Sequence, residues 1–129
     1  MAPYCLLLHD HPILHHQLSV GHFGKFHAAK IVASPAADLV AVADSDGERA
    51  RDVAALYGVS GFADPRDMAG LIDAVTIAVP TKAHFEVAQC FLDAGVHVLL
   101  EKPITDNLDD ARRLVALAEE KNLVLQIGH

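Results

Sequence analysis

Residues 39–44 read Leu-Val-Ala-Val-Ala-Asp, and residues 19–24, upstream of them, read Ser-Val-Gly-His-Phe-Gly. The apolar run shows no alternation of apolar and polar residues, which is typical of a parallel strand covered on both faces. The two glycines lie where a preceding strand would turn into a helix, and Pro35 would end that helix. A strand, a helix and a second buried strand in this order predict a βαβ unit and an α/β fold.

Short apolar runs and longer helical runs alternate up to the end of the chain. We expect strands at residues 39–43, 60–63, 72–79, 96–100 and 123–127, and helices at residues 24–34, 47–57, 81–94 and 108–121, with a short helical turn from Asp64-Pro65. Asp46 is an expected N-cap, Asn107 to Asp110 resemble a capping box, and Gly58 and Gly95 are expected helix ends. This order predicts a Rossmann-like, doubly wound, mainly parallel sheet with helices on both faces.

The first strand of such a sheet lies at its centre, yet residues 13–20 read Ile-Leu-His-His-Gln-Leu-Ser-Val. Burying an unpaired imidazole or amide group costs roughly 1–3 kcal/mol. We therefore expect residues 18–20 to enter the sheet and the segment before them to be poorly paired or displaced. Histidines 9, 11, 15 and 16 match no standard metal-site spacing, and beyond Asp10 no cysteine or carboxylate cluster supports them, so we expect no metal.

Composition narrows the class of protein. The chain has 129 residues, 10 Lys and Arg against 17 Asp and Glu, and a formal net charge of −7. Such an acidic chain does not attract polyanions by its net charge, so we expect no nucleic-acid partner. No apolar run approaches the roughly 20 residues of a membrane span, and we expect no membrane partner. Two cysteines make no disulfide framework, which favours a reducing, cytoplasmic location.

The glycine turn has the chemistry of a phosphate-binding loop. A side chain at Gly21 would block the approach of the backbone to a pyrophosphate, and Gly24 allows close packing of helix and strand. The helix N-terminus then offers free N–H donors to the phosphates. Ser19 stands where G-x-G-x-x-G has its first glycine, and an ordinary turn with two glycines would also explain the stretch.

Asp44 adds a second element, 20 positions beyond Gly24 and directly after a buried strand. A carboxylate there can accept hydrogen bonds from both ribose hydroxyls of an adenine nucleotide, and it repels a 2′-phosphate, so we expect NAD rather than NADP. The alternative role of a helix cap is better filled by Asp46. S-adenosylmethionine enzymes share this layout. The loop and the acid together therefore predict a site for a ligand of nucleotide shape and do not predict a particular reaction.

Two more polar stretches follow buried strands, at the strand ends where open α/β sheets bind ligands. They are Val79-Pro80-Thr81-Lys82-Ala83-His84 and Glu101-Lys102-Pro103. Alone, the second would read as a solvated turn. The glycine turn, Asp44, these two stretches and Gln126-Ile127-Gly128-His129 follow one another along the chain. Together, over residues 18–129, they resemble the N-terminal domain of the glucose–fructose oxidoreductase / inositol dehydrogenase / MocA (Gfo/Idh/MocA) family.

The resemblance implies a role for each matching residue. Gly21, His22, Phe23 and Gly24 would line the pyrophosphate, and Asp44 would hold the adenosine ribose. Ala78, Pro80 and His84 would flank the ribose and phosphate region of the cofactor, and Glu101 would lie near the nicotinamide ribose. Lys102 would be the catalytic residue, since it can donate a hydrogen bond to a developing alkoxide or take the proton of the reacting hydroxyl.

The family further implies hydride transfer between nicotinamide and a sugar, cyclitol or related carbinol, with a C-terminal domain that supplies most of the substrate site. We expect residues 1–17 to be an atypical His-rich segment, residues 18–129 the dinucleotide-binding domain, and the substrate domain to be absent. The isolated chain would then be catalytically incompetent. A non-catalytic nucleotide-binding or sensing module and a self-associating fragment remain alternatives, and we expect a homodimer because uncovered surfaces favour association.

Overall fold

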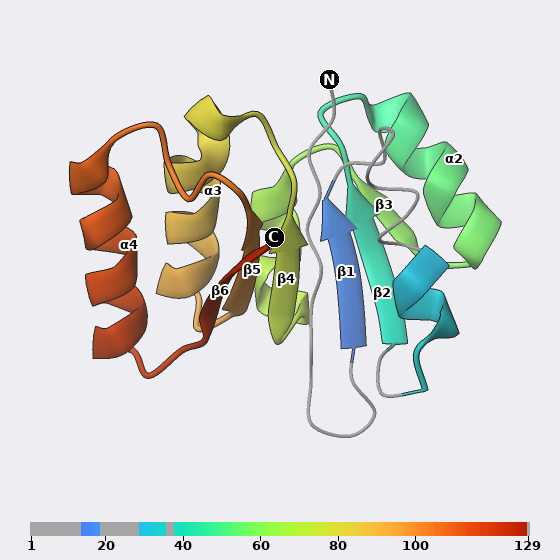
Figure 1. Ribbon diagram of the computed structural model, residues 1–129. Helices are drawn as coiled ribbons and strands as arrows, with labels where there is room; N and C mark the ends of the chain where they lie inside the picture. Colours follow the sequence, from blue (N-terminus) through green and yellow to red (C-terminus); the bar gives the residue numbers. More distant parts are fainter. Residues whose placement is uncertain (1–13, 19–28, 36–37, 129) are drawn as a thin grey trace.

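The computed structural model describes residues 14–18, 29–35 and 38–128 (Figure 1). Six strands form one parallel sheet in the order β3-β2-β1-β4-β5-β6. Their bounds are β1 Leu14–Leu18, β2 Asp38–Ala43, β3 Ser60–Phe62, β4 Ala74–Ile77, β5 His97–Glu101 and β6 Leu125–Gly128. The expected parallel, doubly wound α/β architecture is confirmed.

The helices follow the strands in the expected alternation. Residues 29–33 are helical, and the labelled helices are α2 Gly47–Tyr57, α3 Thr81–Asp93 and α4 Leu108–Glu120, with a 3₁₀ segment η1 at Pro65–Leu71. Figure 1 shows α3 and α4 beside β4 to β6, and α2 beside β2 and β3. The strand order reverses between β1 and β4, which is the point where open α/β sheets form a ligand crevice.

The prediction for β1 is wrong in one respect. His15, His16 and Gln17 are not displaced: the strand pairs in parallel with β2 from Leu14 to Leu18 and with β4 from His16 to Leu18, with one register shift between His15 and His16 on the β2 side. The expected boundary between residues 17 and 18 therefore falls inside a strand. Without β1, the facing edges of β2 and β4 would lose their hydrogen-bonding partners, and each buried unpaired backbone group costs about 1–3 kcal/mol. Pairing along β1 avoids this cost whatever side chains the strand carries.

Helix boundaries agree with the capping residues read from the sequence. Asp46 accepts hydrogen bonds from the Glu48 and Arg49 N–H groups, and Gly58 ends α2 in the left-handed region at φ 67°. Asn107 Oδ1 accepts from the Asp110 N–H at 2.8 Å. In place of the second bond of a capping box, the Asn107 side-chain amide donates to the Asp110 carboxylate.

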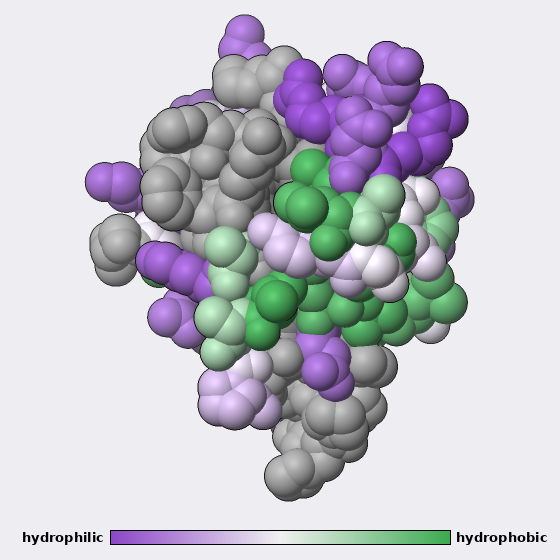
Figure 2. Space-filling model, turned by 90° about the vertical axis from the view of Figure 1, so that its right-hand side faces the viewer, coloured by the Kyte–Doolittle hydropathy of each residue, from purple (hydrophilic) through white to green (hydrophobic). Residues whose placement is uncertain are grey.

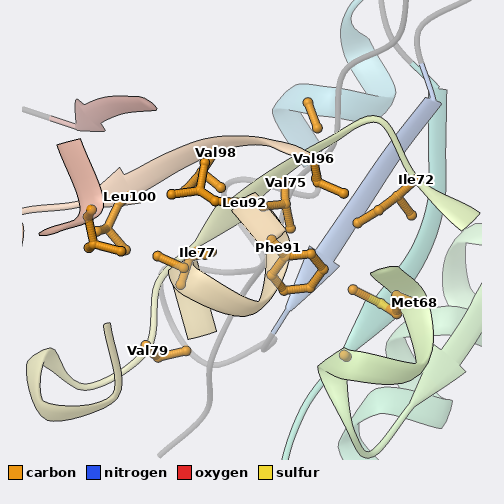
Figure 3. Close-up of a cluster of buried hydrophobic side chains, with 14 of the residues drawn as sticks. Met68, Ile72, Val75, Ile77, Val79, Phe91, Leu92, Val96, Val98 and Leu100 are labelled. Carbon is orange, nitrogen blue, oxygen red and sulfur yellow. The ribbon is translucent and has the colours of Figure 1, made fainter. Parts of the chain in front are cut away.

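The core lies on both faces of the sheet, as alternating side chains of a buried strand require. On β2, Ala41 and Ala43 join the large cluster under η1, α3 and α4, whereas Val42 joins a smaller cluster with Val53 and Ala54 of α2. Figure 3 shows the large cluster, in which the fully buried Phe91 ring lies near Met68 and side chains of β4.

Neither a membrane-spanning helix nor a metal-binding cluster is found in the part of the chain that the structure describes. No helix there is long and apolar enough to cross a membrane. In the same residue ranges, no group of three or more histidine, cysteine and carboxylate side chains comes together as a metal site would need.

Candidate functional site

The predicted site residues come from strand ends that parallel pairing brings to one edge of the sheet. Asp44 directly follows β2, Ala78 directly follows β4, and Glu101 is the last residue of β5. Leu18, the last residue of β1, pairs with Ala43 and with Ile77. The end of β1 therefore lies at the same edge, beside the residues that directly precede Asp44 and Ala78.

Gly21, His22, Phe23 and Gly24 themselves lie outside the described residues. Their contact with a pyrophosphate stays a prediction.

The Asp44 carboxylate is fully buried at the end of β2. Its Oδ1 accepts the Asp46 N–H at 2.9 Å, and its Oδ2 lies 3.5 Å from Arg49 Nη1. Its own N–H donates to the Phe62 carbonyl of β3. Contact of this carboxylate with a ribose stays a prediction.

Arg49 is a residue of this site that the sequence reasoning missed. Its two terminal nitrogens each lie 3.5 Å from a carboxylate oxygen, one of Asp44 and one of Asp46, and its side chain is about one third exposed. The short distance in sequence between Arg49 and Asp44 could have indicated this contact, because a basic residue in the first turn of α2 lies next to the acid that precedes the helix. The cation offsets the charge that Asp44 carries into a buried place.

Ala78 and Pro80 lie between β4 and α3. Ala78 is half-buried and Pro80 is exposed, and the Pro80 carbonyl accepts the Ala83 N–H at 2.8 Å as α3 begins. No side chain caps this helix end. Because the first N–H groups of a helix lack internal partners, the amino end of α3 presents donors near the same edge.

His84 lies in the first turn of α3 and is only 1% exposed. Its Nδ1 lies 2.8 Å from the Pro103 carbonyl oxygen and 3.2 Å from that of Ile104, and its Nε2 lies 2.9 Å from the Val79 carbonyl oxygen. The structure therefore places both ring nitrogens on main-chain carbonyls of two turns. Direct contact of this ring with a cofactor stays a prediction.

Glu101 and Lys102 differ in their surroundings. Lys102 is exposed, so its ammonium group can reach a molecule bound at the edge. Glu101 is half-buried and lies over Gly128 of the neighbouring strand: a Cβ at that glycine would be 3.3 Å from both carboxylate oxygens. Gly128 thus leaves room for the carboxylate. The pairing of Gly128 with Glu101 across β5 and β6 was the only signal that could have indicated this role.

The side chains with clearly shifted pKa values lie away from this edge of the sheet. A cavity of about 230 Å³ between η1 and α3 is lined by residues that include Asp64, Arg66 and Cys90. Hydrogen bonds from Arg66 lower the pKa of the Asp64 carboxyl, and burial raises the pKa of the Cys90 thiol. Cys90 lies nine positions after Thr81, about 13.5 Å farther along the helix, so this cavity is separate from the edge described above.

Comparison with known proteins agrees with this geometry. Residues 19–129 match the Gfo/Idh/MocA model, described as an oxidoreductase family with an NAD-binding Rossmann fold. The chain belongs to this family.

Individual relatives can be named as well. The chain is 43% identical over 112 residues to UDP-N-acetylglucosamine 3-dehydrogenase of Acidithiobacillus ferrooxidans, which covers 87% of this chain and 35% of that protein. It is 33% identical over 112 residues to inositol 2-dehydrogenase of Rhizobium meliloti, which covers 86% of this chain and 34% of the relative.

Solved structures of such enzymes share the fold. UDP-N-acetylglucosamine 3-dehydrogenase GnnA from A. ferrooxidans superposes with a TM-score of 0.80 at 44% identity, over 85% of this chain and 36% of that one. Apo scyllo-inositol dehydrogenase from Lactobacillus casei gives a TM-score of 0.78 at 31% identity, over 84% and 34% of the two chains. The present chain spans about a third of the length of each of these proteins.

The contact between Glu101 and Gly128 gives a testable prediction. In Gly128→Ala, the added methyl group would lie 3.3 Å from both carboxylate oxygens, so the carboxylate has to move. We expect the side-chain carboxyl ¹³C signal of Glu101 to shift clearly, while the free energy of unfolding in urea changes by less than about 1.5 kcal/mol because a flexible side chain can yield. Gly70→Ala is the control, since a Cβ there meets nothing within 4 Å. An unchanged Glu101 signal would contradict the contact.

Proposed function

We propose that this chain is the cofactor-binding part of an oxidoreductase that transfers hydride between a nicotinamide cofactor and a sugar, cyclitol or related carbinol. The observation that carries the proposal is the placement of Asp44, Ala78, Glu101 and Lys102 at one edge of the sheet, next to the reversal of strand order. Membership in the family and relatives named as sugar-nucleotide and inositol dehydrogenases support it.

The nucleotide end of the site has its chemistry at Asp44. As a carboxylate it only accepts hydrogen bonds, so it suits the 2′- and 3′-hydroxyls of an adenosine ribose. A 2′-phosphate would bring a second negative charge to a buried carboxylate, which favours NAD over NADP. Arg49, 3.5 Å away, reduces this repulsion without removing the acceptor. Gly21, His22, Phe23 and Gly24 would complete this end at the pyrophosphate.

The reacting end lies at the turn after β5. Ala78 and Pro80 would flank the cofactor, and Glu101 would lie near the nicotinamide ribose. The cofactor, when bound, supplies the hydride acceptor or donor. Lys102, exposed at the strand end, donates a hydrogen bond to the oxygen of the reacting hydroxyl or takes its proton when deprotonated.

The role of Asp44 predicts a cofactor preference. We expect calorimetric titration of the chain to show NAD binding with micromolar to millimolar affinity and weaker NADP binding. Asp44→Asn should weaken NAD binding by about tenfold or more, because a hydrogen bond to a charged group contributes about 1.5–3 kcal/mol. Asp52→Asn, at an exposed position of α2, is the control and should bind NAD as the original chain does. Tighter binding of NADP than of NAD would refute the role given to Asp44.

Turnover by the isolated chain is the second test. Because this chain spans about a third of its relatives, we expect no measurable NADH production from inositol, glucose or UDP-N-acetylglucosamine, even where NAD binds. Robust turnover would show that residues 1–129 suffice for catalysis. Binding without turnover, and without recovery of turnover when the remaining part of a relative is supplied, would favour the alternative of a nucleotide-binding or sensing module.

We also propose that the chain forms a homodimer and functions in the cytoplasm, where its thiols stay reduced. Cys90 is a free thiol, and β3 and β6 are the two edge strands of the sheet. Leu56 and Val124 are more than half exposed, and Figure 2 shows apolar surface in a band across the face that it presents. A second copy would cover such surface.

Light scattering over a dilution series tests the homodimer. We expect a mass of about twice 13.8 kDa at micromolar concentration, falling toward the monomer value on dilution. A value of 13.8 kDa that persists at high micromolar concentration would contradict the dimer.

A further inference from the structure

His84 is a buried polar side chain whose contacts join the two turns of the proposed site. Its Nε2 faces the Val79 carbonyl, one residue before Pro80. Its Nδ1 faces the carbonyls of Pro103 and Ile104, one and two residues after Lys102. All three partners are main-chain groups, so these contacts do not depend on the side chains of Val79, Pro103 and Ile104.

The three acceptors let the ring bind to either turn. A carbonyl oxygen only accepts, so a ring nitrogen that carries a proton can donate to the carbonyl that it faces. Nδ1 faces the Pro103 and Ile104 carbonyls and Nε2 faces the Val79 carbonyl, so either tautomer of the ring donates to one of the two turns. Turning the ring by 180° would put carbon atoms at both positions and lose these contacts.

The turn after β5 is also fixed at its two ends and at Ile104, which packs against the large core cluster. Glu101 is the last residue of β5 paired with β6, so the strand ladder stops before Lys102. Farther on, the Thr105 hydroxyl donates to the Asn107 carbonyl, and Asn107 caps α4. Between these two anchors, the His84 ring holds the carbonyls of Pro103 and Ile104.

We propose that His84, whose two ring nitrogens lie on main-chain carbonyls of two turns, is a positioning residue that fixes the turn carrying Lys102 relative to the end of β4. The inference rests on the proposed function for the meaning of Lys102, and its structural part can be tested without any cofactor. The ring aligns two segments that a bound dinucleotide would have to touch together, namely the turn before α3 and the turn after β5.

The first experiment measures the ring itself. In the chain labelled with ¹⁵N-histidine, we expect a His84 ring N–H proton to exchange slowly with solvent. A scalar coupling across its hydrogen bond should connect Nε2 to the Val79 carbonyl or Nδ1 to that of Pro103 or Ile104. A His84 ring N–H that exchanges as fast as those of exposed histidines, with no such coupling, would overturn the proposal. Simple packing of the ring would not produce this signature.

The second experiment compares variants. His84→Phe keeps a buried ring without donors, and we expect displaced amide signals for Lys102 and Ile104 and NADH binding weaker by about tenfold, equal to about 1.4 kcal/mol. His84→Gln retains two N–H donors on an uncharged side chain and should give intermediate values. His97→Phe is the matched control: it removes a bond from the Val124 N–H to Nδ1 at the opposite end of β5 and should leave NADH binding within about twofold.

The outcomes separate the inference from the proposed function. If the original chain binds no dinucleotide at millimolar concentration, the proposed function fails. The exchange and coupling measurements on the His84 ring still test whether His84 positions the turn. If NADH binds but His84→Phe and His97→Phe weaken it equally, His84 has no special positioning role. Should His84→Phe not fold, the Gln variant and the spectrum of the unmodified chain decide the question.

Discussion

The main-chain pairing of β1 with both β2 and β4 is the interaction on which the rest of the structure depends. These two ladders join the half of the sheet built from β1, β2 and β3 to the half built from β4, β5 and β6. They also place Leu18, at the end of β1, between Ala43 and Ile77. Because backbone hydrogen bonds do not depend on side-chain type, a strand with the sequence Leu-His-His-Gln-Leu can fill this position.

Asp44 and His84, the two buried polar side chains described at this edge, contact several main-chain groups. Asp44 lies at the end of β2, where the Asp46 N–H and the Arg49 guanidinium satisfy its carboxylate. His84 lies under the other half of the edge, where three carbonyls surround its ring. A buried polar group without such partners would cost about 1–3 kcal/mol. Partners taken from the backbone hold these side chains in place before any ligand arrives.

Most of the fold and part of the site could be predicted from the sequence, because those predictions depend on local chemistry. Unbroken apolar runs predicted β2 and β4, and capping residues such as Asp46 and Asn107 predicted where helices begin. The path of β1 could not be predicted, because a polar strand is retained by its neighbours and not by its own residues. Contacts such as those of Arg49, and of Gly128 with Glu101, depend on side-chain direction across elements, which spacing alone does not determine.

Under the proposed function, nucleotide binding and the chemical step would lie on different halves of the sheet. Asp44 follows β2, in the half that contacts α2, whereas Lys102 follows β5, in the half that packs on α3 and α4. The polar contacts of His84 join α3 to the turn that carries Lys102, and their partners belong to the turns after β4 and β5. A change near Asp44 would therefore leave the contacts that hold the Lys102 turn in place.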